Sequence, residues 1–106
     1  MGKSKIEDEA LKEFIQRLKT RFDIEKIILF GSRARGEALK GSDYDFIIVS
    51  KDFEGIFFTE RVSMLYDLWK LETPLEALCY TPREFEKKAR EISIVREALK
   101  HGIALA

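Results

Sequence analysis

Residues 30–36 carry the first group of side chains in this chain whose types and spacing could do chemistry. They read Phe-Gly-Ser-Arg-Ala-Arg-Gly and directly follow an apolar run, so Gly31 and Ser32 stand where a strand would pass into a helical turn. Free backbone N–H groups at such a turn can hold a phosphate. Glycine lets the phosphate approach closely, and the serine hydroxyl adds a hydrogen-bond donor. The segment therefore predicts a phosphate-binding turn.

A second segment, residues 42–45, reads Ser-Asp-Tyr-Asp and opens another apolar run. Because side chains alternate along a strand, Asp43 and Asp45 are expected to project from one face, with Tyr44 turned away. Two carboxylates on one face suit Mg²⁺, which prefers oxygen ligands. Each segment alone is common, as an ordinary turn or a solvated strand end. Together they form the minimum apparatus for binding a nucleoside triphosphate and transferring part of it.

The positions of apolar residues predict the elements that would hold these segments. Helical spacing over residues 6–22, after a capping box of Ser4 and Glu7, predicts a first helix. Apolar and β-branched runs predict strands at 26–30, 43–50 and 75–80, and the polar stretch 32–38 predicts a helical turn.

Two further helices are predicted in the second half of the chain. Thr59 is expected to cap a helix that runs to about residue 71. The sequence Thr81-Pro82-Arg83-Glu84 is a strong helix start, and apolar periodicity continues to residue 100 with Ser93 as the candidate break point. Gly102 is expected to end that helix as a C-cap.

This order of elements predicts a single α/β (α+β) domain over residues 1–106. Its core would be a small mixed sheet of about three strands with helices packed on it, and the strand order stays open. Phe57 and Phe58 suggest that the connection before the third helix is pinned to the core, and the aromatic residues in general are expected to be core residues.

Composition narrows the class of protein. The chain has 19 Lys and Arg against 19 Asp and Glu, which argues against strong nucleic-acid binding through a basic face. No apolar run is long enough for a membrane span, and the single cysteine excludes an internal disulfide, so we expect a cytoplasmic protein. The absence of Asn and the abundance of Glu and Lys indicate a thermophile source.

Taken together, the two segments resemble the signature of the DNA polymerase beta-type nucleotidyltransferases, and specifically of the minimal nucleotidyltransferase group. That signature runs G-S-x-A-R-G, spacer, S-D-x-D, and element order and length extend the resemblance to essentially the whole chain. The resemblance implies the polymerase beta-type nucleotidyltransferase fold. It also implies that Gly31 and Ser32 hold the triphosphate of ATP and that Asp43 and Asp45 ligate two Mg²⁺ ions.

Members of this family use a third carboxylate, usually Asp, on the strand after the long helix. The corresponding residue here is Glu76, which is one methylene longer. A metal-ligating and catalytic role for Glu76 is favoured, because a charged residue among apolar neighbours is unusual unless it has a partner. The alternative is that Glu76 is simply a charged residue on a sheet edge.

Other candidate residues allow a functional and a structural interpretation. Arg33 and Arg35 flank the glycine turn and would bind phosphate or an acidic partner, unless they are solvated helix residues. His101, the only histidine, is expected to cap a helix C-terminus rather than take part in catalysis. Cys79 lies between apolar neighbours and is expected to be an inert core residue.

The resemblance implies a Mg²⁺-dependent enzyme that transfers AMP from ATP to a hydroxyl. Members of the minimal group are commonly paired with HEPN-type ribonuclease toxins, so the leading hypothesis is an antitoxin that adenylylates such a partner protein. A second hypothesis is a binding module that neutralises its partner by contact alone, with catalysis weakened by Glu76. Transfer to a small hydroxylated molecule is the weakest alternative, and a homo-oligomer stays open.

Overall fold

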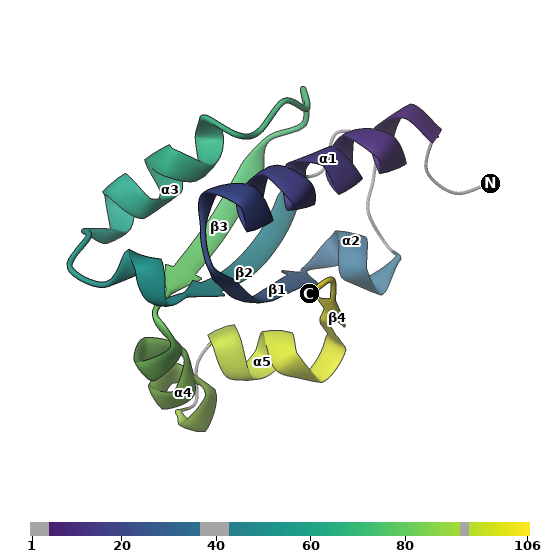
Figure 1. Cartoon of the computed structure of the whole chain (residues 1–106). Coiled ribbons are helices and arrows are strands. Elements are labelled where there is room, and N and C mark those ends of the chain that lie inside the picture. The colour runs from purple at the N-terminus through teal and green to yellow at the C-terminus, as the bar shows by residue number, and fades with distance from the viewer. Residues whose placement is uncertain (1–4, 37–42, 92–93) are drawn as a thin grey trace.

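The computed structural model describes residues 5–36, 43–91 and 94–106 (Figure 1). Helical segments separate all the strands along the chain, as the sequence predicts. The elements are α1 (Lys5–Arg21), β1 (Ile24–Phe30), α2 (Ser32–Arg35), β2 (Tyr44–Ser50), the 3₁₀ helix η1 (Lys51–Phe53), α3 (Phe58–Tyr66), β3 (Leu75–Tyr80), α4 (Pro82–Arg90), α5 (Ile94–His101) and β4 (Ile103–Ala104). The Ser4 cap predicted for the first helix lies outside the described residues.

The strands form one mixed sheet with the order β3-β2-β1-β4. β2 pairs in parallel with β3, and β1 pairs antiparallel with both β2 and β4. The sequence predicts about three strands, so β4 is an addition, in which Ile103 pairs with Leu29 and Ala104 with Ile28. A two-residue strand shows no alternation of polar and apolar side chains, and for this reason its sequence does not reveal it.

One face of the sheet packs against α1 and α3. Tyr44, Phe46 and Ile48 alternate onto this face and are fully buried, as the alternation predicts. Phe14 of α1 is also fully buried and meets Trp69 edge to face, with 4.8 Å between the ring centroids. These large rings pack together with aliphatic side chains such as Leu18 and Leu65 to form the core on this side of the sheet.

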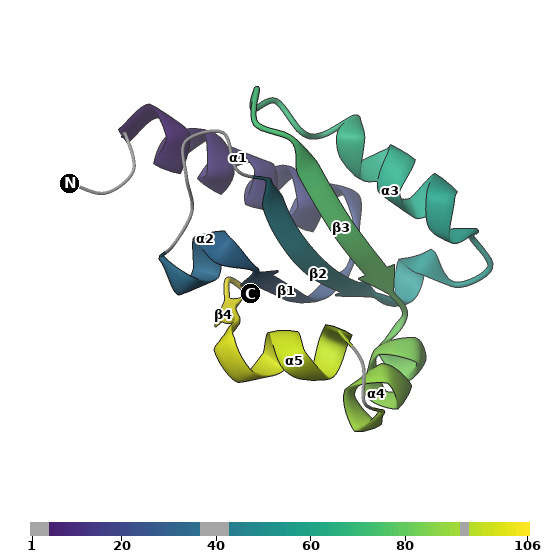
Figure 2. The ribbon, with the colours of Figure 1, turned by 180° about the vertical axis from the view of Figure 1, so that it is seen from behind.

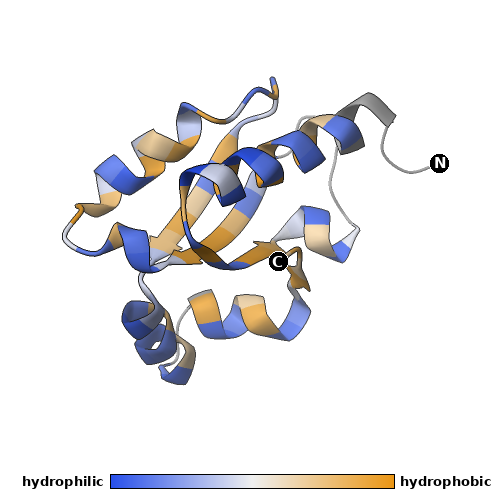
Figure 3. Ribbon diagram, in the orientation of Figure 1, coloured by the Kyte–Doolittle hydropathy of each residue, from blue (hydrophilic) through white to orange (hydrophobic). Residues whose placement is uncertain are grey.

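The opposite face of the sheet carries Ile47 and Val49, which pack with Phe85 of α4 and with Val95 and Ala98 of α5. Figure 2 shows β2 and β3 from behind, with α1 on their far side and α4 and α5 at one end. Apolar residues follow the strands, whereas α1 and α4 carry many polar ones (Figure 3). On this face, the apolar end of β2 is therefore covered by helices, whereas Asp45 near its beginning is only half-buried.

Helix α3 differs from the prediction at both ends. It begins at Phe58, with Phe57 rather than Thr59 as the residue before its first turn, because the Phe57 carbonyl already accepts a hydrogen bond from the Arg61 N–H at 3.0 Å. It ends at Tyr66, after which Trp69 turns to donate its indole N–H to the Thr73 carbonyl at 2.8 Å. Phe57 is 79% exposed, so the expectation that this residue is pinned to the core is wrong.

Helix α3 also covers the outer edge of β3. Arg61 is buried, and its Nη1 donates to the Cys79 carbonyl at 2.9 Å, while the Tyr66 hydroxyl donates to the Leu75 carbonyl. Arg61 forms an ion pair with Glu84, with 2.7 Å between Nη1 and Oε1. These side chains satisfy carbonyl groups of a strand that has a neighbour on one side only.

The last two helices confirm most of the prediction for the end of the chain. Thr81 and Glu84 form the predicted capping box of α4, and α4 and α5 are separate helices. The candidate break point Ser93 lies outside the described residues. Gly102 directly follows α5, and a β-carbon there would meet the Ile28 side chain at 2.7 Å. The glycine therefore lets the end of α5 lie close against β1.

Candidate active site

Gly31 links the end of β1 to α2 in a backbone conformation that suits glycine. Its φ is +76° and its ψ is −159°, a region that other residues rarely enter. The Gly31 carbonyl accepts hydrogen bonds from the N–H groups of Ala34 at 3.1 Å and Arg35 at 3.2 Å. The N–H groups of Ser32 and Arg33 precede these first intrahelical donors, as at every helix start, and are the donors that the predicted phosphate-binding turn would use.

The same glycine lies against the carboxylate of Asp45. A β-carbon at Gly31 would overlap Oδ2 of Asp45 and would lie 3.2 Å from its Cγ. Antiparallel pairing of β1 with β2 causes this approach, because it sets Phe30 opposite Asp45. The structure therefore places the predicted phosphate-binding turn directly beside one of the predicted metal ligands.

Glu76 stands beside Asp45 on the other side. β2 and β3 run parallel with Asp45 and Glu76 in register, so the two side chains project from the same face of the sheet. Glu76 is exposed on the edge strand β3, and Asp43 directly precedes β2. The structure thus brings Gly31, Asp45 and Glu76 together across three neighbouring strands.

The electrostatic environment of Asp45 reflects this crowding. Burial raises the pKa of Asp45 most, and the negative charges of Glu76 and Asp43 raise it further. The positive charge of Arg35 has the opposite effect and lowers the pKa. The carboxylates therefore lie close enough to repel one another, and a cation bound among them would relieve that repulsion.

The two arginines of α2 are separated by the structure. Arg35 acts electrostatically on Asp45 and lies on the carboxylate side of the turn. The Arg33 guanidinium carbon lies 4.0 Å from the ring centroid of Tyr44, whose side chain belongs to the core on the opposite face of the sheet. Arg35 therefore lies near the carboxylates, whereas Arg33 packs against an aromatic ring of the core.

The donor set fits a magnesium ion that is bound together with a triphosphate. Within residues 5–36, 43–91 and 94–106, no three His, Cys, Asp or Glu side chains are grouped closely enough to hold a metal by themselves. Mg²⁺ is usually bound by one or two carboxylates plus substrate phosphates rather than by a full set of protein ligands. Asp43, Asp45 and Glu76 supply oxygen donors of that kind beside a turn that can present phosphate.

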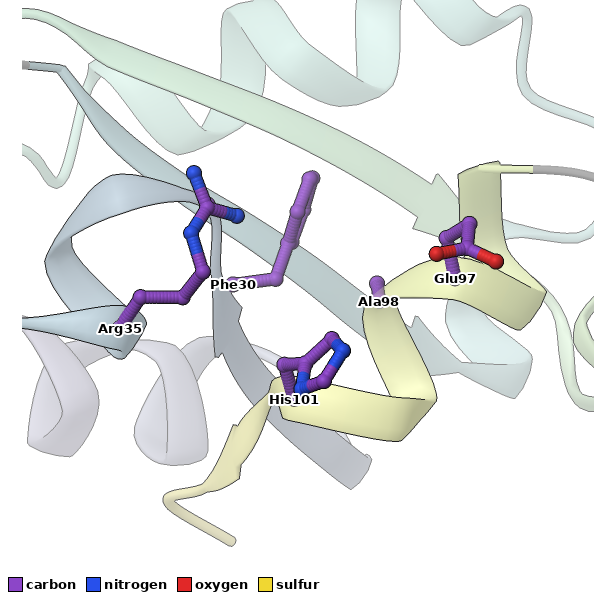
Figure 4. A pocket seen from close by; sticks show the side chains of 6 residues that line it. Phe30, Arg35, Glu97, Ala98 and His101 are labelled. Atoms are coloured by element: carbon purple, nitrogen blue, oxygen red, sulfur yellow. The ribbon is translucent and has the colours of Figure 1, made fainter.

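A pocket of about 260 Å³ adjoins the turn and includes residues that sequence reasoning did not assign to the site (Figure 4). Phe30, Gly31 and Arg35 line it from one side, and Glu97, Ala98 and His101 of α5 line it from the other. The residues of α5 are more than 60 positions away from the glycine turn in the sequence. The only signal in the sequence for their role was the spacing of Glu97 and His101, which lie one helical turn apart. His101 is the last residue of α5, at the helix C-terminus where the sequence predicts it, and it also lines this pocket.

Two further predictions concern the rest of the chain. Cys79 is fully buried, and burial raises the pKa of its thiol to about 12, which agrees with an inert core residue. No helix in the described part of the chain is long and apolar enough to cross a membrane.

The fold, the glycine turn and the carboxylates at the start of β2 agree with one class of protein. Residues 11–104 match the family described as "Nucleotidyltransferase domain", so the chain belongs to that family and is a nucleotidyltransferase. It is 36% identical over 101 residues to a Methanocaldococcus jannaschii protein named "Putative protein adenylyltransferase MJ0604". The alignment covers 93% of this chain and 97% of that protein.

Solved structures have the same fold. A Sulfolobus solfataricus crystal structure assigned as a nucleotidyltransferase superposes with a TM-score of 0.63 and 24% identity, over 98% of this chain and 89% of that one. A toxin-antitoxin complex with AMP-PNP contains a chain that superposes with a TM-score of 0.61 and 18% identity, over 90% of this chain and 71% of that one. At these identities the likeness shows the fold, and the chemistry has to be argued from the site itself.

Proposed function

We propose that this protein transfers AMP from ATP to a hydroxyl group of a partner protein in a Mg²⁺-dependent reaction. The observation that carries the proposal is the contact between Gly31 and Asp45. It sets a turn that can hold phosphates against a carboxylate that can hold a metal, and nucleotidyl transfer requires both at one point.

The triphosphate would be held by the turn between β1 and α2. The backbone N–H groups of Ser32 and Arg33 and the Ser32 hydroxyl would donate to phosphate oxygens, and the Arg35 guanidinium would neutralise their charge. Arg33 would hold α2 in place through its contact with Tyr44, with 4.0 Å from Cζ to the ring centroid. The turn would thus fix the leaving pyrophosphate group on one side of Asp45.

The carboxylates of Asp43, Asp45 and Glu76 would hold two Mg²⁺ ions beside the α-phosphate. When bound, these ions supply charge stabilisation in the transition state and lower the pKa of the attacking hydroxyl. Glu76 lies on the edge strand and is exposed, so an acceptor hydroxyl can reach it from outside the protein. Asp45 lies between this approach and the glycine turn, so an α-phosphate held beside Asp45 would be attacked from the side opposite the pyrophosphate, as an in-line displacement requires.

The identity of the acceptor is proposed from the relatives. The Methanocaldococcus jannaschii protein is named for protein adenylyl transfer and aligns over nearly its whole length. The chain that superposes from the toxin-antitoxin complex with AMP-PNP supports a nucleotide and a partner protein as ligands. We therefore infer an antitoxin role in which a tyrosine of a HEPN-type ribonuclease toxin receives AMP.

The test is mass spectrometry of the partner protein after incubation with the enzyme, ATP and Mg²⁺. We expect an added AMP on a tyrosine with the wild-type enzyme and none with Asp45→Asn. The matched control is Asp67→Asn, which makes the same change at an exposed residue that follows α3. If the wild-type protein is folded and binds ATP but the partner gains no mass, protein adenylylation is refuted.

The alternative is a module that neutralises its partner by contact. It is favoured by one observation, that Glu76 stands on β3 where the family usually has Asp. Under this alternative the partner is inhibited without gaining mass, and inhibition persists in Asp45→Asn. The same experiment therefore separates the two functions.

A further inference from the structure

The pocket beside the glycine turn is lined partly by residues of α5, to which the proposed transfer reaction gives no role. It has a volume of about 260 Å³, which is smaller than the ~300–1,000 Å³ of pockets that enclose a whole small ligand. Such a volume suits one ring system. In Figure 4 the Phe30 ring stands between Arg35 of α2 and Ala98 and Glu97 of α5.

The position of the pocket relative to Asp45 decides which part of the reaction it can serve. Phe30 pairs with Asp45 across β1 and β2, whereas Glu76 pairs with Asp45 across β2 and β3. The pocket and Glu76 therefore flank Asp45 on opposite sides. In an in-line displacement the attacking hydroxyl enters opposite the leaving pyrophosphate. With the triphosphate on the turn and the acceptor at Glu76, the pocket is left for the nucleoside.

We infer that this pocket receives the base of the nucleoside triphosphate, with Phe30 as the surface against which the base stacks. This inference rests on the proposed function, because it takes the triphosphate to be bound at Gly31 and Ser32. Phe30 is half-buried and Ala98 is small and buried, so together they offer an apolar wall of the size of a ring. Stacking on an aromatic side chain is possible for every base, and it contributes strongly to the binding of nucleotides.

Glu97 gives the pocket a preference among bases. Its Oε2 lies 3.1 Å from Nζ of Lys100, and a carboxylate accepts further hydrogen bonds while donating none. Adenine, guanine and cytosine carry an amino group that can donate to it. Uracil presents two carbonyl groups and one N–H, so its carbonyl groups would face a carboxylate unfavourably. Glu97 therefore selects amino-bearing bases over uracil.

The first test compares ATP with inorganic tripolyphosphate as ligands in calorimetry with Mg²⁺. Phe30→Leu keeps an apolar side chain in the pocket and removes the flat ring. We expect it to weaken ATP binding about tenfold, equivalent to about 1.4 kcal/mol, and to leave tripolyphosphate binding unchanged. The control is Leu99→Ala, an exposed residue of α5 outside the pocket lining, which should change neither affinity.

Each other outcome overturns the inference. Equal loss of affinity for ATP and tripolyphosphate in Phe30→Leu would mean that Phe30 supports the turn rather than the base. Unchanged ATP affinity with a raised KM for the acceptor protein would make the pocket an acceptor site. Wild-type protein that binds neither ligand would refute the proposed function itself, which is a distinguishable result.

The second test measures the affinities of the four common nucleoside triphosphates. We expect UTP to bind the wild-type protein more weakly than ATP, and Glu97→Gln, whose amide can donate, to narrow that difference. Glu86→Gln makes the same change on α4 and should leave the order of affinities intact. Equal binding of all four triphosphates by the wild-type protein would overturn the role of Glu97.

Discussion

Gly31 and Asp45 are in direct contact across β1 and β2, and a β-carbon on the glycine would overlap the carboxylate oxygen Oδ2. The contact couples a backbone feature to a catalytic candidate. Gly31 is needed both for its positive φ of +76° and for the space that its missing side chain leaves. Any side chain at position 31 would push the Asp45 carboxylate away from the turn that we propose to bind phosphate.

Gly31→Ala should lower the rate of AMP transfer by more than its loss of stability can explain. The positive φ makes alanine unfavourable by about 1–3 kcal/mol, and displacement of Asp45 should lower activity about a hundredfold or more. Gly55 provides a matched control, because its φ is +78° and a β-carbon there would meet nothing within 4 Å. Thermal melts should show that both Gly31→Ala and Gly55→Ala are destabilised, and transfer rates should show lost activity only in Gly31→Ala. Comparable activity in both variants would argue against the contact as a functional feature.

Asp43→Asn should remove most of the magnesium-dependent stabilisation by ATP. A ligand that binds only the folded state raises its stability by about 2.7 kcal/mol at a hundredfold excess over Kd. In the wild-type protein, Mg²⁺ and ATP together should therefore raise the Tm more than ATP with a chelator. If Asp43→Asn responds to Mg²⁺ and ATP as the wild-type protein does, the carboxylates are not the metal site.

Glu76→Ala should separate binding from chemistry. Asp43 and Asp45 still provide carboxylates for a triphosphate-bound ion, so ATP affinity should change little while AMP transfer is lost. Glu76→Asp is the sharper variant, because it restores the carboxylate that is usual in the family. A rise in transfer would identify Glu76 as an attenuating change, and a fall would show that the backbone of β3 is matched to the longer side chain. Unchanged transfer in Glu76→Ala would exclude a catalytic role for this residue.

The two arginines of α2 should behave differently when each is replaced by glutamine. Arg35→Gln removes a charge beside Asp45 and should weaken ATP binding by about 1.5–3 kcal/mol, the contribution of one charge-assisted hydrogen bond. Arg33→Gln removes the stacking on Tyr44 and should instead lower the stability by about 1 kcal/mol. Calorimetry and thermal melts on both variants measure the two effects. Equal losses of ATP affinity would show that Arg33 also reaches the triphosphate.

The ion pair of Arg61 and Glu84 should make stability depend on acid pH. The hydrogen bond from Arg61 is the largest cause that lowers the pKa of Glu84 from its ordinary value of 4.5. A carboxyl group with a lowered pKa in the folded state stabilises the protein above its ordinary pKa, and this stabilisation is lost as the pH falls through the folded-state value. Glu84 is 37% exposed in its side chain, so solvent reduces the effect.

We therefore expect Glu84→Gln to be less stable than the wild-type protein by about 1 kcal/mol at pH 7, with the difference shrinking below pH 4.5. Glutamine keeps the capping box of α4, so the variant isolates the charge. Glu86→Gln on the same helix is the control. Its difference in stability from the wild-type protein should not shrink below pH 4.5 in this way. Urea unfolding at several pH values measures both, and a pH-independent difference for Glu84→Gln would mean that the pair contributes through hydrogen bonding alone.

Local sequence determined the elements and the two segments of the site. The capping box of Thr81 and Glu84 starts α4 as predicted, because both partners lie within one helical turn. Alternation along β2 sends Tyr44 into the core and Asp45 to the other face, because the side-chain period of a strand is fixed by its backbone. The glycine turn is equally local, since positive φ at Gly31 and the end of an apolar run stand next to each other.

Tertiary structure decided how these pieces meet, because strand order and helix placement depend on which apolar faces can be buried together. Pairing of β1 with β2 brought Gly31 to Asp45, and pairing of β2 with β3 brought Glu76 to its other side. Packing on opposite faces of the sheet separated Arg33 from Arg35, which the sequence treats alike. The return of α5 against β1, made possible by Gly102, brought the exposed helix end at His101 to the pocket beside the glycine turn. No local pattern encodes these contacts, since each joins residues whose separation along the chain is set by the burial of the whole sheet.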